Sequence, residues 1–364
     1  HSILANPSIE NNIAINEIGR SLYDLLIKPL LPVIAGKKNL LIVPDGPLSL
    51  IPFETLIDEN GNYLIEKFNV HYIQSIAVAN LLRERKYEGE RQPMLAFGGA
   101  IYDQVLNGQN TIETDVQLSE LTLNTLTLLD QGNVRSASEA LGKLGYGSWS
   151  NLPGTKVEVE AISTIVKNTN VVMGRDVNES NIKKMSASGE LGNYKVLHFA
   201  THGMTVPNFP ELSSIVLSQV DREQKTEDGY LRMEEIAKLK IRADFVNLSA
   251  CQTGLGKLYA GEGVVGLTHS FLLAGANALS ASLWNVEDES TAKFMVGLYK
   301  LVEDKGMTYF QAINEMKRSF IRGDISVDPF NSKRGVEIIK NGMVKSNKLS
   351  HPFYWAPFVY YGNN

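Results

Sequence analysis

The chain has 364 residues, of which 43% are hydrophobic and 21% are charged, a composition typical of a soluble globular protein with two or three domains. Its formal net charge is −5, and its lysines and arginines are scattered rather than gathered in a stripe. This charge distribution argues against nucleic acid as a direct ligand of this chain, so that a nucleic acid would have to act through another subunit.

The sequence contains a single cysteine, Cys251. It therefore allows neither an intramolecular disulfide nor a zinc site built from several cysteines, and we expect a reducing, cytoplasmic location. The longest apolar stretch, residues 264–284, is interrupted by polar side chains and predicts no membrane span. Because the chain begins with His1 and lacks a signal-peptide pattern, we expect a fragment boundary there, with further domains upstream.

The first part of the chain predicts one helix that prolines end, a buried strand, two further strands and a short helix. These elements lie within residues 8–35, at 40–43 and within 63–83. The polar stretch at 86–93 predicts a boundary, so that residues 1–92 form an N-terminal subdomain and residues 93–364 a second domain.

Beyond this boundary, strand and helix patterns alternate. The expected strands are 94–98, 170–173, 195–201, 214–218, 243–250, 278–283 and 354–361. The expected helices are 157–166, 179–185, 232–237, 263–274, 290–302 and 308–322. Residues 103–150, rich in small and polar side chains, predict a long insertion of low order. The alternation predicts an α/β fold with a mostly parallel sheet covered by helices on both faces.

Two predicted strands end beside residue types that often take part in catalysis. The strand at 195–201 runs into His202 and Gly203, and the strand at 243–250 runs into Cys251. Ligands of open parallel sheets bind beyond the carboxyl ends of the strands. If the two strands are neighbours, an imidazole and a thiol emerge side by side at this edge.

A thiol with its usual pKa of about 8.5 is mostly protonated at neutral pH, and a nearby imidazole can accept its proton or protonate a leaving amine. The backbone N–H groups of Gly203 and Cys251 are natural donors to an oxyanion, because we expect them to lie where the strands end. The sequence therefore predicts a nucleophile, a base and two oxyanion donors.

Simpler interpretations remain open at this point. A lone cysteine is often a small buried hydrophobe, and His202 alone is often a loop or capping residue. His198 faces the same side of its strand as His202 but about 13 Å away, too far to share a metal ion. No serine-hydrolase elbow, phosphate-binding loop or H-E-x-x-H motif is present, so we expect neither a metal nor a cofactor.

Several longer motifs resemble one known family. They are IVPDGPLSLIPFETL (42–56), LPGTKVEVEAI (152–162), HFATHG (198–203), the run from 247 to 291 and HPFYWAPFVYYG (351–362). Together they resemble the CHAT domain, a caspase-like and separase-like peptidase domain found behind tetratricopeptide repeats in bacteria. The resemblance implies that His202 and Cys251 are catalytic, that residues 1–92 form a degenerate subdomain beside the catalytic one, and that no metal takes part in the chemical step.

The segment LWNVEDEST resembles the stretch in which separases place the acidic residue that binds arginine. It makes Glu287, Asp288 and Glu289 candidates for substrate binding, and we select Asp288, with Trp284 and Ser249 as further substrate-binding residues. Alternatively, Asp288 or Glu289 caps a helix that begins near residue 290 and lies in its first turn. A carboxylate in the pocket predicts a preference for arginine or lysine before the cleaved bond.

The sequence as a whole predicts a cysteine endopeptidase that cleaves a partner protein in a bacterial signalling or defence system. An upstream repeat, sensor domain or regulatory subunit is expected to control it, and neither a membrane nor a nucleic acid is expected as a direct partner. The alternatives are a non-catalytic module that binds a peptide at the same sheet edge and, less favoured, a small-molecule hydrolase that uses the same pair.

Overall fold

The computed structural model describes residues 2–7, 9–102, 149–206, 210–219, 227–249, 260–325, 327–328, 337–338 and 348–363. Cys251 and nearly all of the predicted insertion lie outside these residues.

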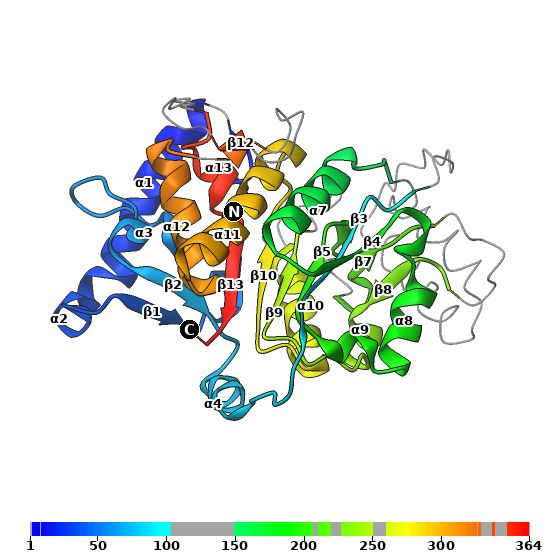
Figure 1. Ribbon diagram of the computed structural model, residues 1–364. Coiled ribbons are helices and arrows are strands. Elements are labelled where there is room, and N and C mark those ends of the chain that lie inside the picture. The colour runs from blue at the N-terminus through cyan, green and yellow to red at the C-terminus, as the bar shows by residue number, and fades with distance from the viewer. Residues whose placement is uncertain are drawn as a thin grey trace, which may run out of the picture.

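The main sheet has eight strands in the order β1-β2-β13-β10-β9-β5-β3-β4 (Figure 1). Its strands are β1 (Asn39–Ile42), β2 (Asn69–Tyr72), β3 (Gln92–Gly98), β4 (Thr169–Met173), β5 (Tyr194–Phe199), β9 (Phe245–Leu248), β10 (Ala278–Ser282) and β13 (Phe358–Gly362). Only β10 and β13 pair in antiparallel fashion, and the other neighbours are parallel. The mostly parallel α/β architecture is confirmed.

Alternate residues of β5 show how helices cover both faces of the sheet. His198 contacts Tyr299 of α11, with 5.5 Å between the ring centroids. The next residue, Phe199, packs against Phe271 of α10 at 5.7 Å. Because successive side chains of a strand point to opposite faces, α11 and α10 lie on opposite sides of the sheet. This burial on both faces explains why β5 and β9 are predominantly apolar runs.

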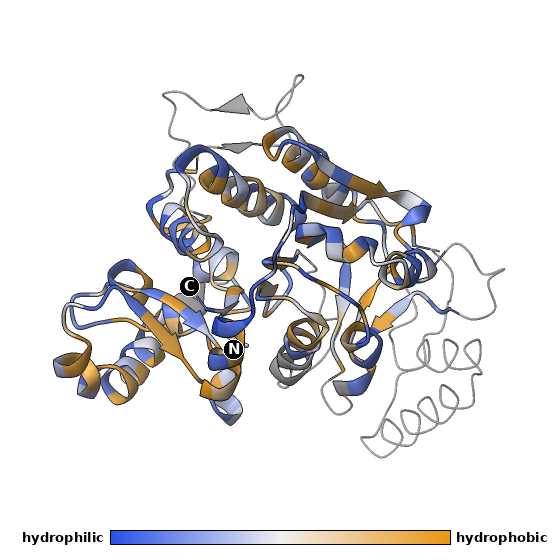
Figure 2. Ribbon diagram, turned by 60° about the horizontal axis from the view of Figure 1, so that its bottom comes forward, coloured by the Kyte–Doolittle hydropathy of each residue, from blue (hydrophilic) through white to orange (hydrophobic). Residues whose placement is uncertain are grey.

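The described helices are α1 (Ile9–Leu26), α2 (Leu31–Ile34), α3 (Leu64–Lys67), α4 (Ile76–Glu84), α7 (Pro153–Ile165), α8 (Glu179–Ala187), α9 (Met233–Ala237), α10 (Ala260–Ala274), α11 (Asp288–Lys305), α12 (Tyr309–Arg322) and α13 (Pro352–Trp355). Short 3-10 helices are η1 (Lys28–Leu30), η2 (Gly46–Leu50), η3 (Phe53–Thr55), η4 (Gly174–Asp176), η5 (Glu190–Asn193) and η6 (Pro210–Leu212). Along the larger helices the residues alternate between hydrophilic and hydrophobic (Figure 2), as expected for helices with one face on the sheet.

Two smaller sheets complete the described strands. One is antiparallel and contains β6 (His202–Met204), β7 (Ser214–Val216) and β8 (Tyr230–Arg232). The other pairs β11 (Val327–Asp328) with β12 (Glu337–Ile338). His202, expected just beyond a strand, is thus the first residue of β6.

Two strand predictions were partly wrong because local capping favours helices. Residues 63–83 contain one strand, β2, rather than two, since the Glu66 carboxylate accepts a hydrogen bond from the Tyr63 amide at 2.7 Å and starts α3. Likewise His351 Nδ1 accepts from the Phe353 amide at 3.0 Å and starts α13. The rest of that segment, β13, joins the sheet as expected.

β13 connects the two ends of the chain within one sheet. It lies between β2 of the N-terminal part and β10, and its side chains are buried on both faces. Burying a large apolar side chain contributes roughly 1.5–3 kcal/mol, so that the three aromatic residues of this short strand anchor it firmly. The domain boundary near residue 92 stays a prediction. Within the described residues, none of the helices has the length and apolarity needed to cross a bilayer.

Candidate active site

The strands that lead to the predicted dyad are neighbours. β5 and β9 pair in parallel, with Phe199 opposite Leu248. His202 and position 251 each follow these paired residues by three positions in the sequence. Cys251 itself lies outside the described residues, so that its distance from His202 stays a prediction.

The imidazole of His202 is held in one tautomer. Its Nε2 lies 2.6 Å from the Ser150 carbonyl oxygen. Because a carbonyl only accepts, Nε2 carries the proton and Nδ1 presents a lone pair. The ring is packed between Tyr102, at 4.6 Å between centroids, and Trp149, at 5.0 Å, so its orientation is fixed.

His202 is a neutral acceptor at physiological pH. Its side chain is completely buried, and this burial lowers the pKa to about 4, against the opposing effect of the hydrogen bond to Ser150. Nδ1 has no hydrogen-bond partner among the described residues. A buried acceptor without a partner is costly to the fold, and it is positioned to accept a proton from a group that approaches it.

Tyr102 places the backbone around His202. The His202 amide donates to the Tyr102 hydroxyl at 3.2 Å, and this hydroxyl donates to the Val216 carbonyl of β7 at 3.0 Å. The His202 amide therefore points to the β7 side of β6. Because successive amides of a strand point in opposite directions, the Gly203 amide points away from β7. β6 is an edge strand of its sheet, which leaves this side without a neighbouring strand in the described part of the chain.

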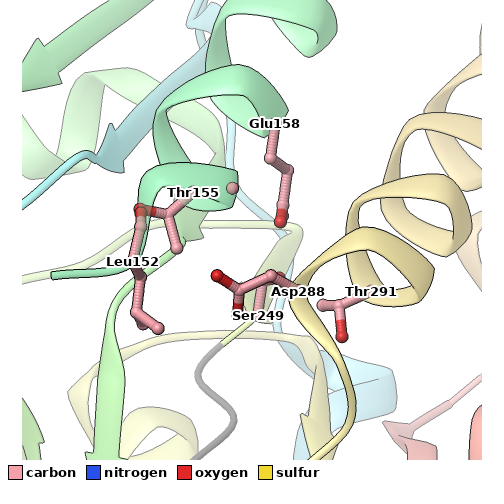
Figure 3. Close-up of a pocket in the computed structure, with 7 residues that line it drawn as sticks. Leu152, Thr155, Glu158, Ser249, Asp288 and Thr291 are labelled. Atoms are coloured by element: carbon pink, nitrogen blue, oxygen red, sulfur yellow. The ribbon is translucent and has the colours of Figure 1, made fainter. Parts of the chain in front are cut away.

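A small pocket lies beyond the carboxyl end of β9, between the first turns of α7 and α11 (Figure 3). It is lined by Leu152, Gly154, Thr155, Glu158, Ser249, Asp288 and Thr291. Two of the predicted substrate-binding residues, Ser249 and Asp288, are therefore brought together.

Asp288 is held between two helix starts. It is the first residue of α11, so the alternative that places Asp288 and Glu289 in the first turn of this helix is confirmed, whereas the N-cap is Glu287 rather than either of them. The Gly154 amide donates to its carboxylate, whereas burial and, secondarily, Glu158 raise its pKa. A Cβ at Gly154 would lie 2.8 Å from Asp288 Cβ, so only glycine allows this approach.

Ser249 and Thr291 are buried, and their hydroxyl oxygens have no hydrogen-bond partner among the residues with described positions. Trp284 is also buried, and its indole N–H donates to the Phe353 carbonyl at 3.0 Å. It does not line the pocket, and its role in substrate binding stays a prediction.

A buried polar network behind the pocket was not predicted. Glu158 Oε1 lies 2.9 Å from His198 Nε2, although the two atoms are not aligned for a hydrogen bond. On its other side, His198 Nδ1 lies 3.0 Å from the Tyr299 hydroxyl and 3.2 Å from Asn247 Nδ2. The motifs LPGTKVEVEAI and HFATHG contain Glu158 and His198, but nothing in the sequence indicates that these two residues lie next to each other.

A separate group of carboxylates is already paired with a cationic side chain. Within the described residues, Glu179, Glu227 and Glu235 are the group of three potential metal ligands whose atoms lie close together. Lys183 Nζ lies 2.7 Å from each of the three carboxylates, so that an ammonium group occupies the place of a cation.

Comparison with known families and proteins agrees with the sequence resemblance. The profile of the CHAT domain matches residues 16–363. Tetratricopeptide repeat protein 28 of Homo sapiens is 24% identical over 95% of this chain, and its Mus musculus counterpart is 22% identical over 98%. The chain spans only 13% and 14% of the length of these relatives.

Two solved structures are among those similar to this chain. One is the Saccharomyces cerevisiae separase–securin complex at 2.6 Å resolution, with 16% identity and a TM-score of 0.43 over 86% of this chain and 15% of that chain. The other is the Arg-specific cysteine proteinase gingipain R, with 8% identity and a TM-score of 0.41 over 98% of this chain and 67% of that chain.

Proposed function

This chain belongs to the CHAT domain family, and on that premise we propose that it is a cysteine endopeptidase with Cys251 as nucleophile and His202 as base. The observation that carries the proposal is the buried, unpartnered Nδ1 of His202 at the edge where β5 and β9 end. His198 Nε2 and His351 Nε2 also lack a hydrogen-bond partner within the described residues, but His198 lies within β5 and His351 is the N-cap of α13, whereas His202 lies beyond the end of β5.

In the proposed reaction, the Cys251 sulfur attacks the scissile carbonyl while its proton moves to His202 Nδ1. The resulting imidazolium donates this proton to the leaving amine, and water then hydrolyses the thioester. The Ser150 carbonyl stabilises the imidazolium through Nε2–H. A His202 pKa of about 4 favours a neutral thiol–imidazole pair at rest, with proton transfer during the attack.

The oxyanion would accept hydrogen bonds from the Gly203 and Cys251 amides. The direction of the Gly203 amide, away from β7, supports its part in this arrangement. Asp288, Ser249 and Trp284 are proposed to bind the substrate, with Asp288 giving a preference for a basic residue before the cleaved bond.

The expected partners are a protein substrate and an upstream controlling segment. The curated relatives are tetratricopeptide repeat proteins of which this chain spans about one seventh. We therefore propose that helical repeats outside this chain control the peptidase. From the sequence resemblance we also propose that residues 1–92 are a degenerate subdomain. The same resemblance supports a bacterial protein that acts in the cytoplasm.

Labelling with an iodoacetamide fluorophore and with a peptidyl acyloxymethyl ketone tests the dyad. We expect the ketone to label Cys251 in the wild type and the rate to fall about a hundredfold or more in His202→Phe. Exposed His269 provides the matched control, His269→Phe, which should react at the wild-type rate. Labelling by iodoacetamide alone, with no ketone labelling and no dependence on His202, would instead support a non-catalytic binding module.

A further inference from the structure

The pocket between α7 and α11 is acidic, and the imidazole of His198 lies behind it, with Nε2 2.9 Å from Glu158 Oε1. Its lining contains the carboxylates of Glu158 and Asp288 but neither lysine nor arginine. Glu158 is only 2% exposed, and burial and, secondarily, the charge of Glu158 raise the pKa of Asp288. Two carboxylates that line one buried pocket form a site complementary to a cation.

Two hydroxyl groups in the same pocket also lack partners. Ser249 is 3% exposed and Thr291 is 5% exposed, and neither hydroxyl oxygen finds a hydrogen bond within the described part of the chain. A buried polar group left in this state costs roughly 1–3 kcal/mol. These oxygens are therefore available to a ligand with hydrogen-bond donors.

The pocket is small. Its cavity volume is about 10 Å³, roughly what one water molecule needs. A primary ammonium is a compact group of this kind, whereas a guanidinium is a wider planar fork.

The arrangement of oxygens also favours a compact cation. Figure 3 shows Glu158 descending from α7 toward Asp288 and Ser249, with Thr291 on the next turn of α11. These acceptors come from three elements and do not form a flat pair. A guanidinium is bound best by two parallel oxygens of one carboxylate, but the Asp288 carboxylate already accepts the Gly154 amide. An ammonium needs only separate acceptors around a point charge.

We propose that this pocket binds a primary ammonium group, so that the peptidase selects lysine over arginine before the cleaved bond, with Glu158 as a second specificity residue beside Asp288. This inference rests on the proposed peptidase function and narrows its basic preference to one side chain.

The test compares three tripeptidyl acyloxymethyl ketones that differ only in the residue next to the reactive ketone: lysine, arginine or norleucine. Norleucine resembles lysine in shape but carries no charge. We expect Cys251 to be labelled about tenfold faster with lysine than with arginine and about a hundredfold faster than with norleucine, since each tenfold step corresponds to ~1.4 kcal/mol of pairing. Glu158→Gln and Asp288→Asn should each reduce the lysine-to-norleucine ratio about tenfold.

Glu160→Gln is the matched control, because Glu160 lies on the same helix, is exposed and is subject to the same change of charge. It should leave all three rates unchanged. Equal labelling by lysine and arginine ketones, or ratios that Glu158→Gln does not alter, would overturn the inference while leaving the dyad intact. Absence of labelling by any ketone would count against the dyad, and the pocket is then judged by the next measurement.

Binding of small cations does not depend on the thiol. Calorimetric titration of the Cys251→Ala chain with n-butylammonium should show binding. The same degree of binding by n-butylguanidinium should need about a tenfold higher concentration, and n-butanol should show no binding. Glu158→Gln in this background should weaken the ammonium about tenfold. Binding of Ca²⁺ in place of n-butylammonium, or of neither cation, would refute the ammonium site.

Discussion

Two clusters of buried polar side chains, one around Glu54 and one around His202, differ in how completely they are hydrogen-bonded. In the cluster around Glu54, both oxygens of the Glu54 carboxylate are hydrogen-bonded, one by Lys317 of α12 and one by the Tyr72 hydroxyl of β2. The same hydroxyl accepts from the Phe53 amide at 2.7 Å. All three charged or phenolic groups of this cluster are buried.

At the carboxyl edge of β5 and β9 the situation is reversed. His202 Nδ1, Ser249 Oγ and Thr291 Oγ1 are buried, but none of them has a hydrogen-bond partner among the residues described. A satisfied cluster ties elements together, whereas unsatisfied groups reduce stability and persist where they serve a ligand or a reaction. The two clusters therefore contrast buried polar groups that serve the fold with buried polar groups that are available for function.

The largest expected effect comes from breaking the satisfied cluster. Lys317→Ala leaves Glu54 buried without its cation, and we expect the free energy of unfolding to fall by about 3–5 kcal/mol in urea denaturation. Lys238→Ala, which removes an exposed pair with Glu234, should cost less than about 1 kcal/mol. A Lys317→Ala loss as small as that of the control would show that this cluster does not support the fold.

The second effect is a pH dependence that originates at His202. Its pKa is about 4 in the folded state and about 6.5 when unfolded, so between these values the unfolded chain binds the extra proton. Stability is thus fully present above pH 6.5 and declines as the pH falls toward 4, by about 3 kcal/mol in total. Urea unfolding at pH 7.5 and 4.5 should show this decline in the wild type and a smaller one in His202→Phe.

Other histidines account for the pH-dependent loss of stability that remains in His202→Phe. Burial lowers the pKa of His71 and of His351 as well, so both contribute to the decline of stability with falling pH in every protein compared. Exposed His269 again supplies the control, and His269→Phe should keep the full wild-type decline. Identical declines in His202→Phe and the wild type would contradict the assignment of a buried neutral imidazole.

The third effect concerns the close approach of α7 to Asp288. Gly154→Ala places a methyl group 2.8 Å from Asp288 Cβ, and we expect a loss of about 1–3 kcal/mol from overpacking. The matched control is Gly192→Ala, where the nearest atom lies 3.4 Å away on the flexible Arg242 side chain. Thermal unfolding of the two variants should separate them clearly, and equal melting temperatures would mean that α7 shifts freely.

Much of this fold follows from patterns local in sequence. Alternating strand and helix periodicities predicted the parallel sheet, and the rule that ligands bind beyond strand ends selected the edge at which His202 and the pocket lie. The errors at α3 and α13 arose where a side-chain cap overrode an apolar run. The start of α11 was misplaced by two residues, so the cap was assigned to Asp288 or Glu289 rather than Glu287.

The site was predicted less completely, because its partners are distant in sequence. Ser150 and Trp149, which hold His202, belong to a segment expected to be a disordered insertion. Glu158 lies in the motif LPGTKVEVEAI, but only the packing of α7 against α11, β3 and β4 brings it to His198. Ser249 was predicted to bind substrate and Thr291 was not, but residue type alone does not show that the hydroxyls of both lack partners.

The smallest expected effect on stability tests the comparison most directly, because it contrasts two buried serines. Ser218 accepts from the Ile101 amide at 2.9 Å and donates to the Gly174 carbonyl at 2.8 Å, so Ser218→Ala should lower the free energy of unfolding by about 1–3 kcal/mol. Ser249→Ala removes an unpartnered hydroxyl, and we expect no loss or a gain of up to about 1 kcal/mol. The same Ser249 variant should bind n-butylammonium more weakly, whereas Ser218→Ala should not. If Ser249→Ala is as destabilising as Ser218→Ala, its hydroxyl has a structural partner and the pocket loses one of its acceptors.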